Sequence, residues 1–476
     1  MSVRLPRLLS RVRQRYFGTD ISSYGFNRYG TYPGIGWRPR CPGCLFPNPS
    51  PIPELKSIAP LRAAQSPGEF LLRDQGKPLD VIYLLVDVGK TLDNTPVLHS
   101  QILDWIRVQS EHGIRIGLVA AAGDEEHFHK SITPALDASG VKHKIIPGGN
   151  LPSVMVRSVR AVRALRREQG GRHVYVRGIW GAVAHALAFP WGGPELIYDF
   201  RGDGVSESEY HGGGSIRRSI LDRLVRFSLW RASNIICVSH GASDVLIDRY
   251  NKQAMAVIPS CVDLDRIGLS SKVRVDTRKA LGVRATDVVI AYAGGTSRYQ
   301  QIPEMLRAWR SLNEDGDLKF LLLINGTPTP DGSVPKEDDT PDGTVIRQGL
   351  SRAEVASYLM AADIGFMLRE SHPLNSVASP VKFAEYLSTG LAVVTSPDLG
   401  DVSSLVADRS LGVLVDPNDG SDIVNKSREL ISKVRANPEA HRQRSNEAVR
   451  DRLDWKAYLD TWSSLLGLSD SQGQNP

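Results

Sequence analysis

Cysteine is scarce in this chain, with four residues among 476. So few thiols do not make a disulfide framework for a chain of this length, and Cys237 and Cys261 are expected to be reduced. Cys41 and Cys44 have the spacing of a zinc knuckle or a redox pair, but no second pair follows and no strand precedes them. Structural or incidental thiols are therefore favoured over a metal site at Cys41 and Cys44.

Long hydrophobic runs are also absent. No apolar run approaches the length of a membrane span, and the first 20 residues lack the apolar core of a signal peptide. The expected location is therefore the cytoplasm. Hydrophobic residues make up 41% of the chain and charged residues 23%, a globular composition that excludes the disordered class and suits two or three domains.

The excess positive charge lies at the beginning of the chain. Residues 1–40 contain eight arginines and one aspartate, a net charge of +7, whereas the whole chain carries +6. This leader and the Pro- and Gly-rich residues up to 77 predict an N-terminal extension draped over a domain. Its charge favours peripheral binding to an anionic membrane surface, at the inner face, over nucleic acid. The alternatives are a solvated arm or one packed on the protein's own acidic surface.

A second basic element is expected on a helix spanning residues 153–169. Five arginines repeat there at helical spacing, opposite an apolar face: Arg157, Arg160, Arg163, Arg166 and Arg167. A solvated face is favoured over a membrane-contacting one.

From residue 81 onward, short apolar runs alternate with amphipathic segments. The runs VIYLLVD at 81–87, IRIGLVA at 114–120, HVYVRG at 173–178 and ELIYDFRG at 195–202 are typical of buried strands with helices between them. A second block begins near residue 277 and contains VVIAYAGG at 288–295 and KFLLLING at 319–326. This alternation predicts an α/β protein with two domains, each with a parallel sheet covered on both faces.

The stretch SPVKFAEYLSTGLAVV at 379–394 is the most informative. It lies between two short strands, so it predicts a crossover helix with Ser379 as N-cap, Pro380 at the first position and Gly390 just past the end. The helix start would lie at the carboxyl end of a strand, where its N–H groups can bind an anion. Lys382 could then neutralise a diphosphate, and Glu385 on the same face could accept hydrogen bonds from ribose or sugar hydroxyls. The alternative is an exposed Lys/Glu pair worth about a few tenths of a kcal/mol.

Longer segments resemble a known family. The stretch LRESHPLNSVASPVKFAEYLSTGLAVVTS resembles the nucleotide-sugar site of the retaining GT-B glycosyltransferases, in particular glycosyltransferase family 4. The segments DFRGDGVSE at 199–207, NIICVSHG at 234–241, VIPSCVD at 257–263 and IAYAGG at 290–295 resemble the same family in the expected order. The resemblance implies GT-B architecture, with two Rossmann-like parallel-sheet domains facing a cleft.

The expected boundaries follow from this architecture. They are 1–77 for the basic extension, 78–262 for an N-terminal acceptor domain, 263–442 for a nucleotide-sugar domain, 443–468 for a C-terminal helix crossing back to the first domain, and 469–476 for a disordered tail.

The resemblance also implies roles for particular residues. Lys382 and Arg298 would supply positive charge to the leaving diphosphate without a metal, and Glu385 would bind the nucleotide ribose. No cofactor is expected, since the nucleotide-diphosphate sugar is a substrate. The expected donor-binding residues are Gly294, Gly295, Glu370, Asn375 and Ser379.

Three positions depart from the family pattern. Val377 stands where the paired-glutamate motif has its first acid, so Glu370 or Asn375 is expected to serve the sugar instead. Gly295 and Gln300 fall near the positions of an Arg and a Lys, which leaves Arg298 as the expected cation. Arg177 stands at a strand end where a histidine is common.

A polar cluster is expected at the cleft face of the first domain. Its acceptor-site residues would be Gly89, Arg177, Asp199, Arg201 and Glu207. The alternatives are an Asp/Arg ion pair that shapes a loop and, for Gly89, a simple turn glycine.

The favoured function is a retaining, metal-independent glycosyltransferase. It would move a sugar from a nucleotide-diphosphate donor to a saccharide or lipid-linked acceptor in cell-surface polysaccharide or glycolipid synthesis. The alternatives are a nucleotide-sugar epimerase or hydrolase of the same fold and a non-catalytic binding protein. No nucleic-acid partner is expected.

Overall fold

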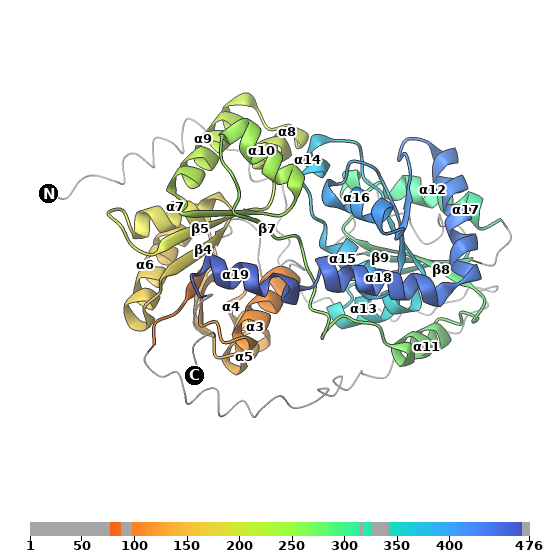
Figure 1. Ribbon diagram of the computed structural model, residues 1–476, viewed down its shortest axis with the longest axis horizontal. Helices are drawn as coiled ribbons and strands as arrows, with labels where there is room; N and C mark the ends of the chain where they lie inside the picture. Colours follow the sequence, from red (N-terminus) through yellow and green to blue (C-terminus); the bar gives the residue numbers. More distant parts are fainter. Residues whose placement is uncertain (1–76, 87–97, 315–317, 325–339, 341, 469–476) are drawn as a thin grey trace, which may run out of the picture. The chain divides into compact units, whose positions relative to one another are not determined.

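The computed structural model describes residues 77–86, 98–314, 318–324, 340 and 342–468 (Figure 1). Two parallel sheets form its framework, with strand orders β3-β2-β1-β4-β5-β6-β7 and β10-β9-β8-β11-β12-β13. The α/β class with two parallel-sheet domains is therefore confirmed. The predicted extension at 1–77, with Cys41 and Cys44, lies outside the described residues except for its last residue, and so do Gly89 and the predicted tail.

The first sheet comprises the strands up to residue 257. They are β1 Val81–Leu85, β2 Ile116–Ala122, β3 Lys142–Pro147, β4 His173–Arg177, β5 Glu195–Phe200, β6 Asn234–Cys237 and β7 Ala256–Val257. Its helices are the π-helix η2 Leu98–Leu103, α3 Asp104–Glu111, α4 Glu125–Ser131, α5 Thr133–Ala138, α6 Leu151–Gln169, α7 Ile179–Ala188, α8 Gly204–Tyr210, α9 Ser215–Arg231 and α10 His240–Tyr250.

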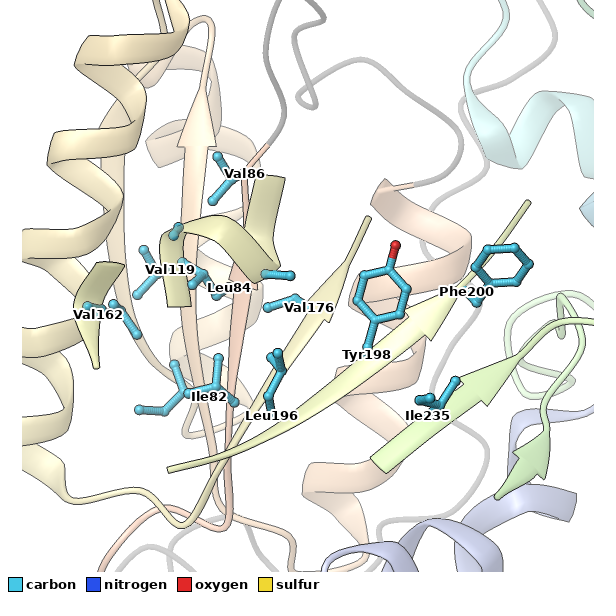
Figure 2. Packing of buried hydrophobic residues seen from close by; sticks show 14 of the residues in the cluster. Ile82, Leu84, Val86, Val119, Val162, Val176, Leu196, Tyr198, Phe200 and Ile235 are labelled. Atoms are coloured by element: carbon cyan, nitrogen blue, oxygen red, sulfur yellow. The ribbon is translucent and has the colours of Figure 1, made fainter. Parts of the chain in front are cut away.

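Side chains of each strand alternate between two hydrophobic cores, because successive residues of a strand point to opposite faces of the sheet. In β1, Ile82 and Leu84 pack with α6, α7, α9 and α10, whereas Val81 and Tyr83 pack with η2 and α3. Figure 2 shows the first of these cores, with Ile82, Leu84, Val86, Val119, Val162, Val176, Leu196, Tyr198, Phe200 and Ile235 labelled. Burial on both faces explains why the strand sequences are continuously apolar.

The second sheet repeats this plan. Its strands are β8 Val288–Gly294, β9 Leu318–Ile324, β10 Thr344–Gln348, β11 Ile364–Met367, β12 Ala392–Thr395 and β13 Gly412–Leu414. The helices are α11 Ser271–Ala280, η3 Arg298–Gln300, α12 Ile302–Leu312, α13 Arg352–Ala361, α14 Pro373–Ser376, α15 Val381–Ser388, α16 Gly400–Asp408 and α17 Gly420–Ala436. Residues of α13, α15 and α16 cover one face, and residues of α12 and α17 cover the other.

The C-terminal segment contacts both domains. Helix α18 (Pro438–Arg452) packs Ala448 and Val449 into the core of the second sheet, and η5 (Trp455–Tyr458) and α19 (Leu459–Leu465) follow it. Trp455 and Trp462 are fully buried in the core of the first sheet. Among the described residues, no helix combines the length and apolarity that a bilayer span requires.

The predicted N-cap of the crossover helix is wrong. Helix α15 begins at Val381 after Pro380, and the Ser379 hydroxyl accepts a hydrogen bond from the Ser260 amide at 2.9 Å instead. Ser379 therefore serves the segment that joins the two domains. Gly390, just past the helix, has a φ of 84°, as a C-terminal glycine requires.

Candidate active site

Strand β8 ends in a glycine whose backbone lies against a buried ammonium. Gly294 has a φ of 153°, and a Cβ there would lie 2.5 Å from Nζ of Lys382. Lys382 comes from the first turn of α15, and its Nζ lies 4.5 Å from the ring centroid of Tyr292. The missing side chain at Gly294 therefore leaves room for Lys382 at the carboxyl end of β8. Gly295 follows, and its carbonyl accepts a hydrogen bond from the Tyr292 hydroxyl at 2.5 Å.

Lys382 shares a hydrogen-bond acceptor with a second cation, Arg369. Oε1 of Gln300 accepts from Nζ of Lys382 at 2.8 Å and also from Nη1 of Arg369. Both cations are buried, with relative exposures of 8% and 6%. Burial, followed by the charge of Arg369, lowers the pKa of Lys382 well below its ordinary value, and burial also lowers the pKa of Arg369.

Two like charges that meet on one neutral oxygen destabilise the protein unless an anion joins them. In the part of the chain that the structure describes, no carboxylate accepts a hydrogen bond from Lys382 or Arg369. The pair therefore suits a ligand with several negative oxygens, such as a diphosphate, because charge-assisted hydrogen bonds are the strong ones.

Glu385 lies one turn after Lys382 on α15 and is half-buried. Burial raises the pKa of its carboxyl, and the charges of Arg352 and Lys382 oppose that rise. Arg352 opens α13 and also forms a 2.5 Å ion pair with Asp104, which is fully buried at the start of α3. The Glu385 carboxylate is thus placed to accept hydrogen bonds from a pair of hydroxyl groups beside the anion site.

Glu370 and Asn375 lie between β11 and α15, Glu370 in the segment after β11 and Asn375 in the short helix α14. Oε2 of Glu370 accepts from the hydroxyl of Tyr210, at the end of α8, at 2.7 Å, and Nδ2 of Asn375 donates to the Glu370 carbonyl at 2.7 Å. Burial raises the pKa of Tyr210 to about 12, while the charge of Arg298 opposes the rise. Arg298 is exposed at the start of η3, and its positive charge acts on Tyr210.

Val377 occupies an apolar contact rather than a polar site. Its side chain is 2% exposed and packs into a core of the first domain, and its carbonyl accepts from the Ser239 hydroxyl at 3.0 Å. A carboxylate here would be buried among apolar side chains without a partner. This contact accounts for the valine where the family motif has an acid.

The predicted cluster of the first domain forms around Asp199. The carboxylate is 1% exposed, and its Oδ2 accepts from Nε of Arg201 at 2.6 Å and from the hydroxyl of Tyr175. Arg177 pairs with Asp199 in the β4–β5 register. Burial and the charge of Arg201 lower the pKa of Arg177 to about 10. Oδ1 of Asp199 and Nη1 of both arginines have no hydrogen-bond partner among the described residues.

Two guanidinium groups against one carboxylate leave this cluster with excess positive charge and unused donors. It is therefore suited to a ligand that carries an anionic or hydroxyl group. Glu207 does not join it, because its side chain is exposed on α8.

Three residues of the site were not predicted as site residues from the sequence: Arg369, Gln300 and Tyr292. Arg369 is the second residue after β11, and Gln300 ends the short helix η3 that follows β8. Both therefore lie near carboxyl strand ends, which is the signal that the sequence offers. No local sequence pattern predicts that a glutamine accepts hydrogen bonds from both Lys382 and Arg369.

A separate hollow lies on the second domain. It encloses about 580 Å³ and is lined by residues of α12 and α17, including Arg307, Ser311 and Arg428. None of its lining residues belongs to the Lys382 cluster, so its chemistry is separate. In the same described ranges, no three His, Cys, Asp or Glu side chains gather as a metal site would require.

Two sequence families match the chain. Glycosyltransferase Family 4 matches residues 99–266, and Glycosyl transferases group 1 matches residues 287–433. No curated protein sequence matches the chain.

Solved structures share the fold. Sucrose-phosphate synthase from Thermosynechococcus elongatus has a TM-score of 0.60 at 16% identity, with 81% of this chain and 98% of that chain covered. Anabaena HepE in complex with UDP and glucose has a TM-score of 0.60 at 16% identity, covering 81% and 99%. A putative UDP-N-acetylglucosamine 2-epimerase from Listeria monocytogenes has a TM-score of 0.51 at 10% identity, covering 84% and 98%.

The two parallel-sheet domains, the family matches and these neighbours define a glycosyltransferase of the GT-B class. Within that class, the first domain matches Glycosyltransferase Family 4 and the second domain matches Glycosyl transferases group 1.

Proposed function

We propose that the chain is a retaining glycosyltransferase that moves a sugar from a nucleotide-diphosphate donor to a saccharide or lipid-linked acceptor. The pathway would be synthesis of cell-surface polysaccharide or glycolipid. The observation that carries the proposal is the pair of buried cations, Lys382 and Arg369, which meet on the Gln300 oxygen without a carboxylate partner among the described residues.

The donor site follows from that pair. Lys382 and Arg369 would hold the diphosphate and stabilise the charge that develops as the sugar leaves, which is the contribution that a metal ion makes in other transferases. Glu385 would accept hydrogen bonds from the nucleotide ribose. Glu370 and Asn375 would contact the donor sugar. Retention requires the acceptor oxygen to approach from the face that the diphosphate leaves, so positioning contributes much of the catalysis.

Nucleotide binding tests the donor half of the proposal. UDP is the first candidate, because HepE, a structure of the same fold, is described in complex with UDP and glucose. Calorimetry with UDP, GDP, ADP and CDP should give saturable binding for at least one of them, and weaker binding for Lys382→Ala. Binding of none of the four would contradict the proposal.

The acceptor is assigned to the cluster of Asp199, Arg201 and Arg177. Once transfer to a membrane or saccharide extract is measured, Arg177→Gln should raise the acceptor KM by about tenfold and leave the donor KM unchanged. Arg160→Gln, an exposed arginine on α6, is the matched control. An altered donor KM with an unaltered acceptor KM would move Arg177 out of the acceptor site.

An epimerase is the second candidate, favoured by the shared fold of the Listeria protein. Such an enzyme would consume nucleotide sugar rapidly without any acceptor, so product analysis in the absence of acceptor separates the two activities. A binding protein of this fold would bind nucleotide and never consume donor with any extract.

The basic leader is proposed to hold the enzyme at the inner face of an anionic membrane. Deleting residues 1–40 removes a net charge of +7. Each basic residue near such a surface contributes about 1 kcal/mol, screened over about 8 to 10 Å. The deletion should therefore lower salt-sensitive vesicle binding and leave nucleotide binding intact. Equal flotation of both chains at low and high salt would remove this role.

A further inference from the structure

Helix α9 exposes a stripe of large apolar side chains on the face opposite its buried side. Ile216, Ile220, Phe227 and Trp230 have relative exposures of 63%, 37%, 36% and 71%. Their spacings of 4, 7 and 3 residues place them along one side of the helix. Val225, Ser228 and Leu229 are buried on the other side. The rings of Phe227 and Trp230 lie 6.0 Å apart, so the stripe ends in an aromatic pair.

The stripe is embedded in positive charge. Helix α9 carries one acidic residue, Asp222, which accepts hydrogen bonds from Arg226 and Arg249. Its five arginines are Arg217, Arg218, Arg223, Arg226 and Arg231. Arg223 lies within the apolar stripe, and Arg217 directly follows Ile216. Arg223 is exposed within the stripe and Arg217 is exposed at its flank, whereas Arg218 forms an ion pair with Glu209 of α8.

A neighbouring turn adds to the surface. Nη2 of Arg231, the last residue of α9, donates to the Phe189 carbonyl at 2.7 Å, which ties the end of α9 to the turn after α7. That turn presents Trp191, which is 97% exposed. Figure 1 shows α9 and α7 next to each other on the first domain. Of the eleven large hydrophobic side chains exposed in the described ranges, nine belong to the first domain.

Helix α6, the basic helix predicted from the sequence, differs from α9 because most of its arginines contact other residues of the first domain. Arg157 donates to the carbonyls of Pro147 and Gly148, and Arg163 donates to those of Leu187 and Ala188. Arg166 lies over the Phe189 ring at 5.2 Å. Three of its five arginines therefore hold the first domain together, and α6 is a weaker lipid-binding surface than α9.

We infer that the α9 stripe, with Trp191, docks the first domain onto an anionic lipid surface. Arginine beside exposed tryptophan and phenylalanine is the pattern of helices that lie in the headgroup region, where the rings enter the boundary and the cations meet phosphates. A second copy of the chain is a poorer occupant, because two arginine-rich helices repel each other. Docking through α9 goes beyond the proposed transfer reaction and the proposed leader contact, and it does not depend on either.

Vesicle flotation of the full-length chain tests the inference. Vesicles of phosphatidylcholine with phosphatidylglycerol are compared with phosphatidylcholine alone. Binding is repeated at high salt, which screens the arginines of both the leader and α9 and leaves the contribution of the apolar stripe. The variant Phe227→Ser/Trp230→Ser should lower partitioning to anionic vesicles at least about tenfold. The matched control is Ile247→Ser/Val275→Ser, which changes two exposed apolar residues of other helices, at 49% and 63% exposure, and should bind as the unaltered chain does.

A second variant tests the charge. Arg217→Gln/Arg223→Gln should weaken binding to anionic vesicles and leave binding to neutral vesicles unchanged. Thermal unfolding should be the same for every variant, because the altered side chains are exposed. Equal flotation of the α9 aromatic variant and its control would overturn the inference. A dimer that dissociates in that variant while vesicle binding persists would overturn it too, and would make α9 a self-association surface. Nucleotide calorimetry reports separately on the transfer reaction.

Discussion

At the scale of single residues, Lys382 occupies a position that lowers the stability of the fold. Its ammonium is buried, its neighbour Arg369 carries the same charge, and the shared Gln300 oxygen is neutral. Replacing a buried charge that has no hydrogen-bonded counter-ion by an apolar side chain commonly stabilises a protein. Residues that serve a ligand can therefore be recognised by the stability that they cost.

The first prediction is that Lys382→Met stabilises the fold while weakening donor binding. The free energy of unfolding should rise by about 1 to 3 kcal/mol, because a buried ammonium is replaced by an apolar side chain of similar length. Nucleotide affinity should fall by about one to two decades. Urea unfolding and calorimetry measure the two effects, with Lys279→Met, an exposed lysine on α11, as control. Unchanged nucleotide affinity would remove Lys382 from the site.

The second prediction concerns protons. Because the pKa of Lys382 is lowered without ligand, a bound diphosphate should raise it and binding should take up a proton. The affinity for the diphosphate should therefore fall as pH rises from the pKa of free Lys382 to its pKa in the complex. Below the lower of these two pKa values the affinity should not depend on pH. Calorimetry in two buffers of different ionisation enthalpy counts the protons that are taken up. The pH of both buffers should lie about two units above the diphosphate's own pKa of about 6. Proton uptake that persists in Lys382→Met would assign it to another group.

At the scale of elements, the start of α10 contacts α14, which lies between β11 and α15, and the start of α16. The amide of His240 donates to both carboxylate oxygens of Asp401, each at 3.1 Å, at the start of α16. A Cβ at Gly241 would lie 2.2 Å from the carbonyl oxygen of Ser376, which belongs to α14. The start of α10 thus fixes the loop that leads to Lys382.

The third prediction is that Gly241→Ala disturbs this contact. The clash involves backbone, so α10 or α14 must shift, and the variant should lose about 1 to 3 kcal/mol of stability and bind donor less tightly. Gly204→Ala is the matched control, because a Cβ at Gly204 meets nothing within 4 Å. Equal unfolding midpoints for the two variants would show that the contact tolerates a methyl group.

Elements with strong local signals were predictable from the sequence. Ser351 and Glu354 have the S-x-x-E spacing of a capping box, a pattern that predicts the start of a helix, and both reciprocal hydrogen bonds are present at the start of α13. Strand β13 was not predicted because it has only three residues, and β10 was not predicted because its residues directly follow a stretch of sequence rich in Pro, Asp and Gly. Arg369 and Gln300 come together only when segments 69 residues apart fold, so no local pattern could place them beside Lys382.

At the scale of the whole molecule, the last described residues complete the first domain. The rings of Trp105 and Trp455 stack at 4.9 Å, and Trp462 lies edge-on to Trp105 at 5.8 Å. Nε1 of Trp455 donates to the Ser100 carbonyl at 3.1 Å, across 355 residues of sequence. The core of the first domain is therefore complete only when η5 and α19 have been made.

The fourth prediction follows from this packing. Trp462→Ala should cost about 3 to 5 kcal/mol, because it removes a fully buried ring from a core that cannot collapse around the gap. Trp191→Ala, which removes a ring that is 97% exposed, should leave the urea midpoint unchanged. A midpoint for Trp462→Ala equal to that of the control would mean that α19 contributes little to the first domain.

The Gln300 side chain has a consequence for inhibitor chemistry. Its neutral amide oxygen accepts hydrogen bonds from both Lys382 and Arg369, two donors that also suit a diphosphate. A small molecule that presents a primary carboxamide to these donors would imitate the protein's own group rather than the substrate. Such a compound would carry no net charge, so it would cross membranes that exclude nucleoside diphosphates.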